Sequence, residues 1–197
     1  MRPVQVSPAT IAAAIGACAR EPAALNSERI EQRFGSYGID VLSHKSGVRR
    51  SSLYSFAGAT KICRTYAVVK FVDESTPSVA EAHTAVLGGS SIGANFKSAD
   101  WQIAKISLHV GSVLLDDPEH SICQLMLLAG PIEVGVHAYQ LVLEKDSQTI
   151  DYATIIETHH PDYLSPAELE EIYSGSIDVA ISDEEMHKFS TLIRDMD

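Results

Sequence analysis

Apolar and polar positions follow a helical period near both ends of the chain and a period of two in its middle. The alanine-rich segment 7–20 predicts a first helix, because its opening serine and proline suit a cap and a first helical turn. Asn26–Ser27 predicts the cap of a second, short helix, in which Ile30 and Phe34 stand four residues apart on one face.

Strand-like alternation begins at Ile39. Two strands are predicted over Val48–Phe56 and Ile62–Val72, and the four residues between them form a predicted hairpin loop. Lys145–Gln148 predicts a second hairpin loop. The further predicted strands are Trp101–Val110, the nearly continuous apolar run Ile122–Leu128, Gly135–Glu144 and Thr149–Thr158.

Serine and glutamate three residues apart mark the predicted starts of further helices, since each side chain can bond the other's backbone N–H. The Ser78–Glu81 pair predicts a helix that ends near Leu87. Ser165–Glu168 and Ser182–Glu185 predict two more helices toward the end of the chain. Strands gathered in the middle and joined by hairpins indicate an α+β fold, an antiparallel β-sheet with flanking helices.

The composition is that of a folded chain without a membrane span. Its 197 residues are 45% hydrophobic, which is enough for one domain with a sizeable core. No apolar run approaches the ~20 residues that cross a bilayer. Met1–Gln5 also lacks the basic-then-apolar layout of a secretory signal. We therefore expect a cytoplasmic protein with no membrane partner.

Charge is unevenly distributed along the chain. The 26 acidic and 15 basic side chains give a net charge of −11, which argues against a general nucleic-acid binder. Residues 165–197 hold 9 acids and 2 bases, whereas residues 29–70 hold 8 bases and 2 acids. The locally basic strands favour a site for a small carboxylated molecule.

Neither the cysteines nor the histidines form a metal-binding pattern. Cys18, Cys63 and Cys123 are widely spaced and include no C-x-x-C pair, so we interpret them as reduced core thiols. His159–His160 and the acidic segment Asp116–His120 could supply ligands, but adjacent residues of an extended segment point to opposite faces. We interpret both segments as solvated loops and expect no metal and no cofactor.

The glycine-rich segment Gly88–Gly93 has the glycine spacing of a phosphate-binding loop. Ala94–Asn95 stands where that loop requires lysine followed by serine or threonine, so the segment is interpreted as a turn that lets the backbone approach a ligand or a packed neighbour. No serine lies in a G-x-S-x-G motif, so nucleophilic acyl transfer is not supported.

Two features indicate a binding site. Arg49 and Arg50 lie on one predicted strand and Arg64 on the next, and arginines on facing strands suit a small carboxylate, which the guanidinium binds bidentately. Glu157 stands alone in the apolar and hydroxylic run Ala153–Thr158, where burial would favour an acid role. An ordinary surface glutamate paired with an arginine is the alternative that spacing alone favours.

The order of these segments resembles the chorismate lyase family, whose members remove pyruvate from chorismate to leave 4-hydroxybenzoate. The similarity extends from about Ile30 to Leu164. Its pieces are Arg33–Phe34 with a short strand after Tyr37–Gly38, the arginine-bearing segment Val48–Tyr54, Cys63–Val69, Leu87–Gly88 with Ser91–Phe96, and Ile155–Thr158.

The resemblance implies a lyase that needs no metal or redox cofactor. The family's essential strand arginine falls on Arg50 or Arg49, of which Arg50 is preferred, and only one of the two can face the site because neighbouring strand residues point to opposite faces. The family's catalytic glutamate falls on Glu157. The substrate-binding groups implied by the resemblance are the other strand arginine, Arg64, and backbone groups around Ile30 and Ile92.

The resemblance also divides the chain. It implies an N-terminal helical segment, 1–26, a chorismate lyase-like domain, 27–164, and an acidic C-terminal helical extension, 165–197. The family's fold is shared with ligand-sensing domains of bacterial transcription regulators, so fold alone does not decide the activity.

Two other functions are weighed against a lyase. A non-catalytic binding module is favoured by Ser51, Ser52 and Ser55, which replace mostly aliphatic positions of the family and make the expected cavity more polar. An interaction scaffold that docks through the acidic C-terminal helices is the third interpretation. The sequence does not decide whether the chain forms a homo-oligomer.

Overall fold

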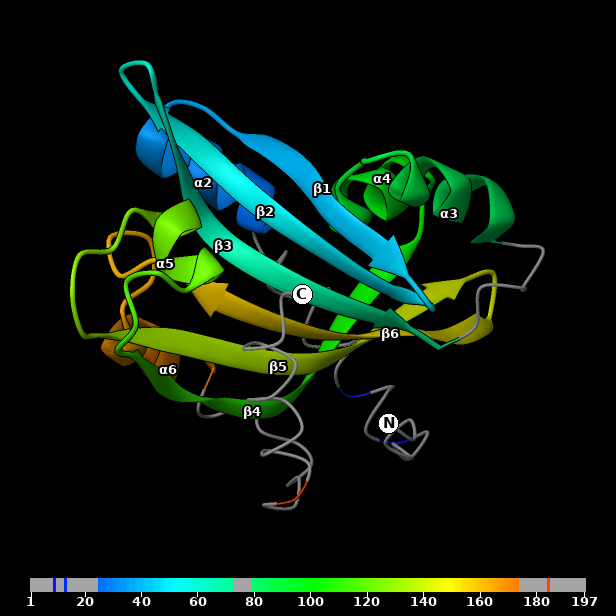
Figure 1. Cartoon of the computed structure of the whole chain (residues 1–197). Helices are drawn as coiled ribbons and strands as arrows, with labels where there is room; N and C mark the ends of the chain where they lie inside the picture. Colours follow the sequence, from blue (N-terminus) through cyan, green and yellow to red (C-terminus); the bar gives the residue numbers. More distant parts are fainter. Residues whose placement is uncertain (1–8, 10–12, 14–24, 73–78, 174–183, 185–197) are drawn as a thin grey trace.

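The structure confirms an α+β fold built on one antiparallel sheet. The computed structural model describes residues 9, 13, 25–72, 79–173 and 184, and within them six strands lie in the order β1-β2-β3-β6-β5-β4 (Figure 1). The strands are β1 (Gly38–Lys45), β2 (Val48–Ala57), β3 (Thr60–Phe71), β4 (Gln102–Leu115), β5 (Ile132–Lys145) and β6 (Gln148–His159). The helices are α2 (Asn26–Phe34), α3 (Ala80–Leu87), α4 (Ile92–Ser98), α5 (Ser121–Met126) and α6 (Pro166–Tyr173).

Tight two-residue turns set the register of three hairpins. Ala57 pairs with Thr60 and Lys145 with Gln148, so both predicted hairpins are confirmed, each with only the two inner residues in the turn. The turn between β1 and β2 has positive φ at Ser46 and Gly47, 53° and 71°, as a type I′ turn requires. Pairing of β3 with β6 then joins the two hairpin halves into one sheet.

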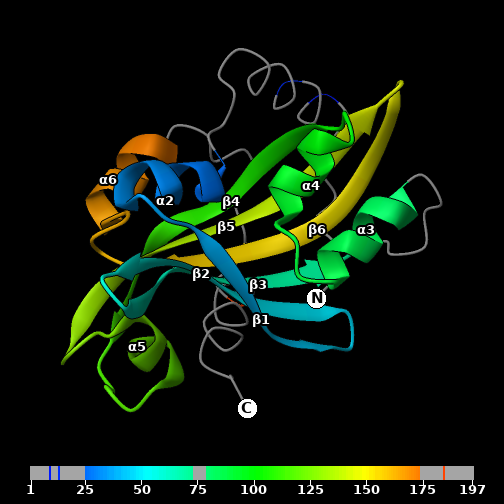
Figure 2. The ribbon, with the colours of Figure 1, turned by 90° about the horizontal axis from the view of Figure 1, so that it is seen from above.

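Alternation along the strands gives the sheet two different faces. In β3, Tyr66 and Val68 pack with α5, whereas Ala67, Val69 and Phe71 face the opposite side. That opposite side carries α2, α3, α4 and α6, while α5 lies alone on the first face among the described helices (Figure 2). The face that carries the four helices is called the inner face below.

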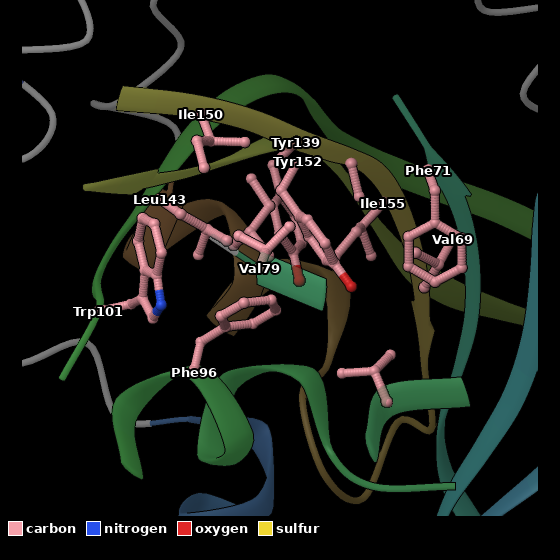
Figure 3. Packing of buried hydrophobic residues seen from close by; sticks show 13 residues of the cluster. Val69, Phe71, Val79, Phe96, Trp101, Tyr139, Leu143, Ile150, Tyr152 and Ile155 are labelled. Atoms are coloured by element: carbon pink, nitrogen blue, oxygen red, sulfur yellow. The ribbon is translucent and has the colours of Figure 1, made fainter. Parts of the chain in front are cut away.

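Aromatic side chains fill the core between the inner face and the helices α3 and α4 (Figure 3). Phe96 of α4 packs edge-on against Tyr152 of β6, with ring centroids 4.7 Å apart. Trp101 closes this core next to Phe96, with ring centroids 6.3 Å apart. These contacts pack α4 against the sheet, so the start of α4 lies above the inner face.

One predicted strand is wrong, because residues 122–128 contain the helix α5 instead. Ile122 and Met126 are four residues apart and both fully buried, so the short apolar run satisfies a helical period as well as a strand. His120 caps the helix, since its ring Nδ1 accepts from the Ile122 N–H at 3.3 Å. The left-handed Leu127, with φ of 55°, ends it.

The helix starts agree with the sequence only in part. The Ser165–Glu168 capping box is confirmed: the Ser165 backbone N–H donates to the Glu168 carboxylate at 2.8 Å, and the Glu168 N–H donates to the Ser165 hydroxyl at 3.3 Å. The cap predicted at Asn26–Ser27 is wrong, because Leu25 is the cap residue and Asn26 already belongs to α2. Asn26 instead uses its side chain in the site described below.

Several predictions fall outside the described residues. Most of the predicted first helix and the helix predicted from Ser182–Glu185 lie there, and so does Ser78 of the predicted Ser78–Glu81 capping box. Within the described ranges, no helix combines the length and the apolar character needed to span a membrane. The helix α6, although placed in the predicted C-terminal extension, contributes Leu169 to the buried core.

Candidate functional site

A cavity lies on the inner face, between the sheet and the first residues of α2 and α4. Its volume is about 70 Å³, and all six strands contribute residues to its lining, β1 through Ile39 alone. Leu25 and Gly93 close it from above: a Cβ on Gly93 would lie 2.5 Å from a terminal carbon of Leu25. Glycine at 93 therefore serves a packed neighbour, as the sequence suggested for this segment.

Glu157 of β6 lies in this cavity and is almost completely buried, with 5% of its surface exposed. Its Oε1 accepts two hydrogen bonds, from the Asn26 side-chain amide at 2.7 Å and from the Tyr139 hydroxyl at 3.0 Å. Among the described residues, Oε2 has only a longer contact, 3.8 Å to Nε2 of His159. The two oxygens of Glu157 therefore differ, since one is saturated by donors and the other is not.

A second layer of residues fixes the donors to Glu157. The Tyr163 hydroxyl donates to Oδ1 of Asn26 at 2.9 Å, which orients the amide so that its NH₂ group faces Glu157. Burial and the nearby Glu157 carboxylate raise the pKa of Tyr139 well above its usual value. Tyr139 therefore keeps its proton and acts as a donor to Oε1 at any ordinary pH.

Arg49 of β2 contributes a buried positive charge to the same cavity. It is 1% exposed, and burial lowers the pKa of its guanidinium. Nε donates to the Ser51 hydroxyl at 2.8 Å, and one terminal nitrogen donates to the backbone carbonyls of Val86 and Ser90 at 2.7 and 3.2 Å. All three acceptors are neutral oxygens, and no carboxylate pairs with Arg49 within the described part of the chain.

Lys105 of β4 brings a second positive charge to the cavity wall. Its Nζ lies 4.7 Å from the centre of the Tyr139 ring, a cation–π contact. Among residues 25–72 and 79–173, no carboxylate lies within ion-pair distance of it. The cavity thus holds two cationic side chains from distant strands of the sheet and one carboxyl group between them in strand order.

Arg49, rather than the preferred Arg50, faces the cavity. The two residues alternate across β2, and Arg50 lies on the opposite face, where it interacts with the Tyr66 hydroxyl and helps to limit the rise of that group's pKa, which burial sets at about 12. The preference for Arg50 is therefore wrong, because the alternation along β2 turns Arg49 and not Arg50 to the inner face.

Arg64 and Ile30 lie outside the cavity lining. Arg64 points toward α2, where its guanidinium lies 3.9 Å from the Phe34 ring centre and its Nε donates to the Ser55 hydroxyl at 2.8 Å. Ile30 is fully buried in the core beneath α2. Of the backbone segments expected to contact a ligand, the one around Ile92 does line the cavity.

The interpretation of His159–His160 as a solvated loop is wrong. His159 is the last residue of β6 and 1% exposed, and His160 is 8% exposed. β6 continues farther than the predicted strand because Gly135 and Thr65 pair with His159 on its two sides. The segment around Asp116 is exposed as expected, and no cluster of metal-binding side chains occurs among the described residues.

Sequence reasoning missed three residues of the site: Asn26, Tyr139 and Lys105. Tyr139 and Lys105 stand on predicted strands, two residues from Leu141 and Ile103. This spacing predicts which side chains share a face, but it does not predict which side chains of other strands they contact. Asn26 carried a signal that pointed elsewhere, since asparagine before a helix usually serves as a cap. The reduced core thiols are confirmed for Cys63 and Cys123, which are buried and free, while Cys18 lies outside the described residues.

Comparisons with known proteins add nothing to this geometry. No protein-family model, no curated protein and no solved structure matches the chain.

Proposed function

We propose that the cavity on the inner face binds a small carboxylated molecule and that the protein is a carbon–oxygen lyase of the chorismate lyase type. The observation that carries this proposal is Arg49, a buried guanidinium whose acceptors in the described ranges are all neutral and which shares its cavity with Glu157. The chorismate lyase activity is proposed from the resemblance of the sequence segments, whereas the carboxylated ligand is proposed from the cavity.

The physical reason is the cost of an uncompensated buried charge. Transfer of an isolated guanidinium from water into the protein costs several kcal/mol, which neutral acceptors offset only in part. An anionic ligand in the cavity would supply the missing charge, and its carboxylate matches the planar fork of arginine. Lys105 adds a second attraction for an anion on the opposite side of Glu157 in the strand order.

The proposed reaction is an elimination. The ether C–O bond between the ring and the enolpyruvyl group of chorismate breaks, the ring carbon that bears the hydroxyl loses its proton, and the ring becomes aromatic. The departing enolate takes up a proton and becomes pyruvate, so the products are 4-hydroxybenzoate and pyruvate. Glu157 contributes through Oε2, which as a carboxylate oxygen is available to accept a hydrogen bond from the ring hydroxyl.

Ligand entry requires the cavity to widen. A volume of about 70 Å³ is smaller than the roughly 150 Å³ of an engineered cavity that takes up benzene. The contact between Leu25 at the start of α2 and Gly93 on α4 is the part of the wall that separates, because both residues belong to helix starts rather than to the sheet. The sheet itself, with Arg49 and Glu157, keeps its geometry.

A non-catalytic binding module is the second candidate, and the environment of Glu157 favours it. Oε1 is already held by two donors, and Ser51 serves as an acceptor for Arg49, as expected for a preformed polar binding site. This candidate predicts the same ligand class without turnover.

Incubation of the purified protein with chorismate tests the proposal, with pyruvate and 4-hydroxybenzoate both quantified. We expect stoichiometric formation of the two products. Glu157→Gln keeps the shape of the side chain and is expected to lower the rate by a factor on the order of 10² or more, as loss of a general acid–base group does. Glu133→Gln, on the exposed part of β5, is the matched control and should retain the wild-type rate.

A thermal-shift measurement with 4-hydroxybenzoate separates the two candidates. Stabilisation without turnover supports the binding module and rejects the lyase. A protein that neither converts chorismate nor is stabilised by carboxylated rings contradicts both.

A further inference from the structure

His159 follows Glu157 by two residues on β6, so both side chains lie on the same face, and it has no role in the site so far. It pairs with Thr65 across the ladder of β3 and β6, and both side chains lie on the inner face. Nδ1 of the ring is 3.0 Å from the Thr65 hydroxyl, and Nε2 is 3.8 Å from Oε2 of Glu157. Nε2 has no hydrogen-bond partner in the described residues, although the ring is 1% exposed.

The ring is neutral at pH 7. Burial is the main cause that lowers the pKa of His159 to about 4, and the positive charges of Lys105 and Arg29 lower it further, while the Glu157 carboxylate acts in the opposite direction. A neutral imidazole carries one N–H, so only one of its nitrogens can donate.

The two tautomers differ sharply in what they place against Glu157. If Nδ1 carried the proton, it would donate to Thr65, and the lone pair of Nε2 would face a carboxylate oxygen, which is repulsive. If Nε2 carries the proton, the Thr65 hydroxyl donates to Nδ1 and the N–H is directed toward Oε2. A threonine hydroxyl can donate or accept, so the hydrogen bond between Thr65 and His159 is kept in the second arrangement.

We propose that His159 is a positioning residue for Glu157: in the Nε2–H tautomer selected by Thr65, it orients the carboxylate so that Oε2 is presented to the ligand. The inference rests on the proposed function, because it concerns the same carboxylate. Asn26 and Tyr139 hold Oε1 on one side, and His159 limits rotation of the carboxylate from the other. The ring itself is fixed by Tyr163, which packs against it at a centroid distance of 5.7 Å.

The distance of 3.8 Å between His159 Nε2 and Glu157 Oε2 leaves room for a ligand to bind the same oxygen. It exceeds the 2.7–3.2 Å of an N–H···O hydrogen bond, so the ring attracts Oε2 without saturating it. A shift of about 1 Å in the carboxylate would complete the bond. When a ligand donor binds Oε2 from the cavity side, the two donors share one oxygen and fix the carboxylate plane between them.

Nitrogen NMR of ¹⁵N-histidine-labelled protein at pH 7 tests the tautomer without any ligand. We expect His159, assigned by loss of its signals in His159→Gln, to show a protonated Nε2 and an unprotonated Nδ1. Thr65→Val removes the hydroxyl donor and should populate the Nδ1–H form, whereas Thr65→Ser keeps a hydroxyl and should restore the wild-type pattern. An Nδ1–H tautomer or an imidazolium in the wild type overturns the inference.

Binding of 4-hydroxybenzoate to the full chain, measured by titration calorimetry, tests the positioning role. His159→Phe removes the donor while keeping a ring and should weaken binding about tenfold, the loss of roughly one hydrogen bond. His159→Gln places an amide N–H near the position of Nε2 and should remain within about threefold of the wild type. Equal affinities of His159→Phe and the wild type contradict the role.

The outcomes separate this inference from the proposed function. A wild type that binds 4-hydroxybenzoate but carries the Nδ1–H tautomer overturns the inference alone. A wild type that binds no carboxylated ring overturns the proposed function, and the positioning role with it. Both variants are first checked for a wild-type thermal midpoint, and His137→Phe, at the neighbouring buried histidine, measures the effect of changing a core ring as such.

Discussion

Two adjacent arginines show how completely a residue's chemistry depends on the face it occupies. Arg49 and Arg50 are identical in type and follow each other on β2, yet Arg49 lines the cavity and Arg50 lies near Tyr66 on the other face. Successive side chains of a strand point to opposite faces of the sheet, so the two guanidinium groups lie in different packed layers. Only one of the two guanidinium groups can therefore meet a ligand on the inner face.

Substitution of each arginine in turn tests this assignment. Arg49→Gln should weaken binding of 4-hydroxybenzoate by about 10- to 100-fold, since a hydrogen bond to a charged group contributes roughly 1.5–3 kcal/mol. Arg50→Gln removes the same charge from the opposite face and should leave the affinity within about twofold of the wild type. Titration calorimetry on both folded variants measures the difference, and a larger loss for Arg50→Gln would reverse the assignment.

The hairpin of β5 and β6 is the element that places Tyr139 and Glu157 together. Its turn consists of Asp146 and Ser147, which have positive φ of 50° and 64°. A type I′ turn requires this backbone, but a residue with a Cβ adopts it at a cost of about 1–2 kcal/mol. The two-residue turn therefore fixes the pairing of β5 with β6, although aspartate and serine are less favourable than glycine in a left-handed backbone.

Ser147→Gly should stabilise the protein by about 0.5–1 kcal/mol. Glycine adopts the left-handed backbone without the free-energy cost that serine has there. Part of this stabilisation is lost because glycine has more conformational entropy in the unfolded chain. Gly47→Ala in the β1–β2 turn, where φ is 71°, is the opposite control and should destabilise by about 1–2 kcal/mol. Urea unfolding at pH 7 measures both changes, and a less stable Ser147→Gly variant would show that this turn depends on the serine side chain.

At the scale of the whole molecule, the fold buries several histidines that ordinarily titrate near pH 6.5. Burial lowers the pKa of His159 to about 4 and that of His137 well below its usual value. The folded protein therefore resists protonation at both rings, whereas the unfolded chain takes up protons below about pH 6.5. The free energy of unfolding must then decrease as the pH falls from about 6.5 toward 4.

This pH dependence is measurable as a difference between variants. His159→Gln removes one of the titrating groups, so its unfolding free energy should fall less between pH 7 and pH 4 than that of the wild type. The expected difference approaches about 3 kcal/mol, from a shift of about 2.5 pKa units at 1.36 kcal/mol each. Urea unfolding at a series of pH values provides the test, and parallel pH profiles for the two proteins would contradict it.

The sequence by itself determined the class of fold and most of its elements. Period-two alternation, capping serines and hairpin turns depend on local backbone geometry, and Ser165–Glu168 and both predicted hairpins follow from it. The same local rules failed for 122–128, because a short apolar run fits a helix as well as a strand until its neighbours are known.

The site was decided only by the tertiary structure. Glu157 and the arginine pair were visible in the sequence. Which arginine shares the cavity with Glu157 depends on how β2 is turned in the sheet, and a change of one residue in strand register would exchange the two. Asn26 and Glu157 are 131 residues apart and meet at 2.7 Å only because α2 packs over the inner face of the sheet. Local sequence patterns determine where strands and helices form, whereas a cavity arises from the order and faces in which these elements pack.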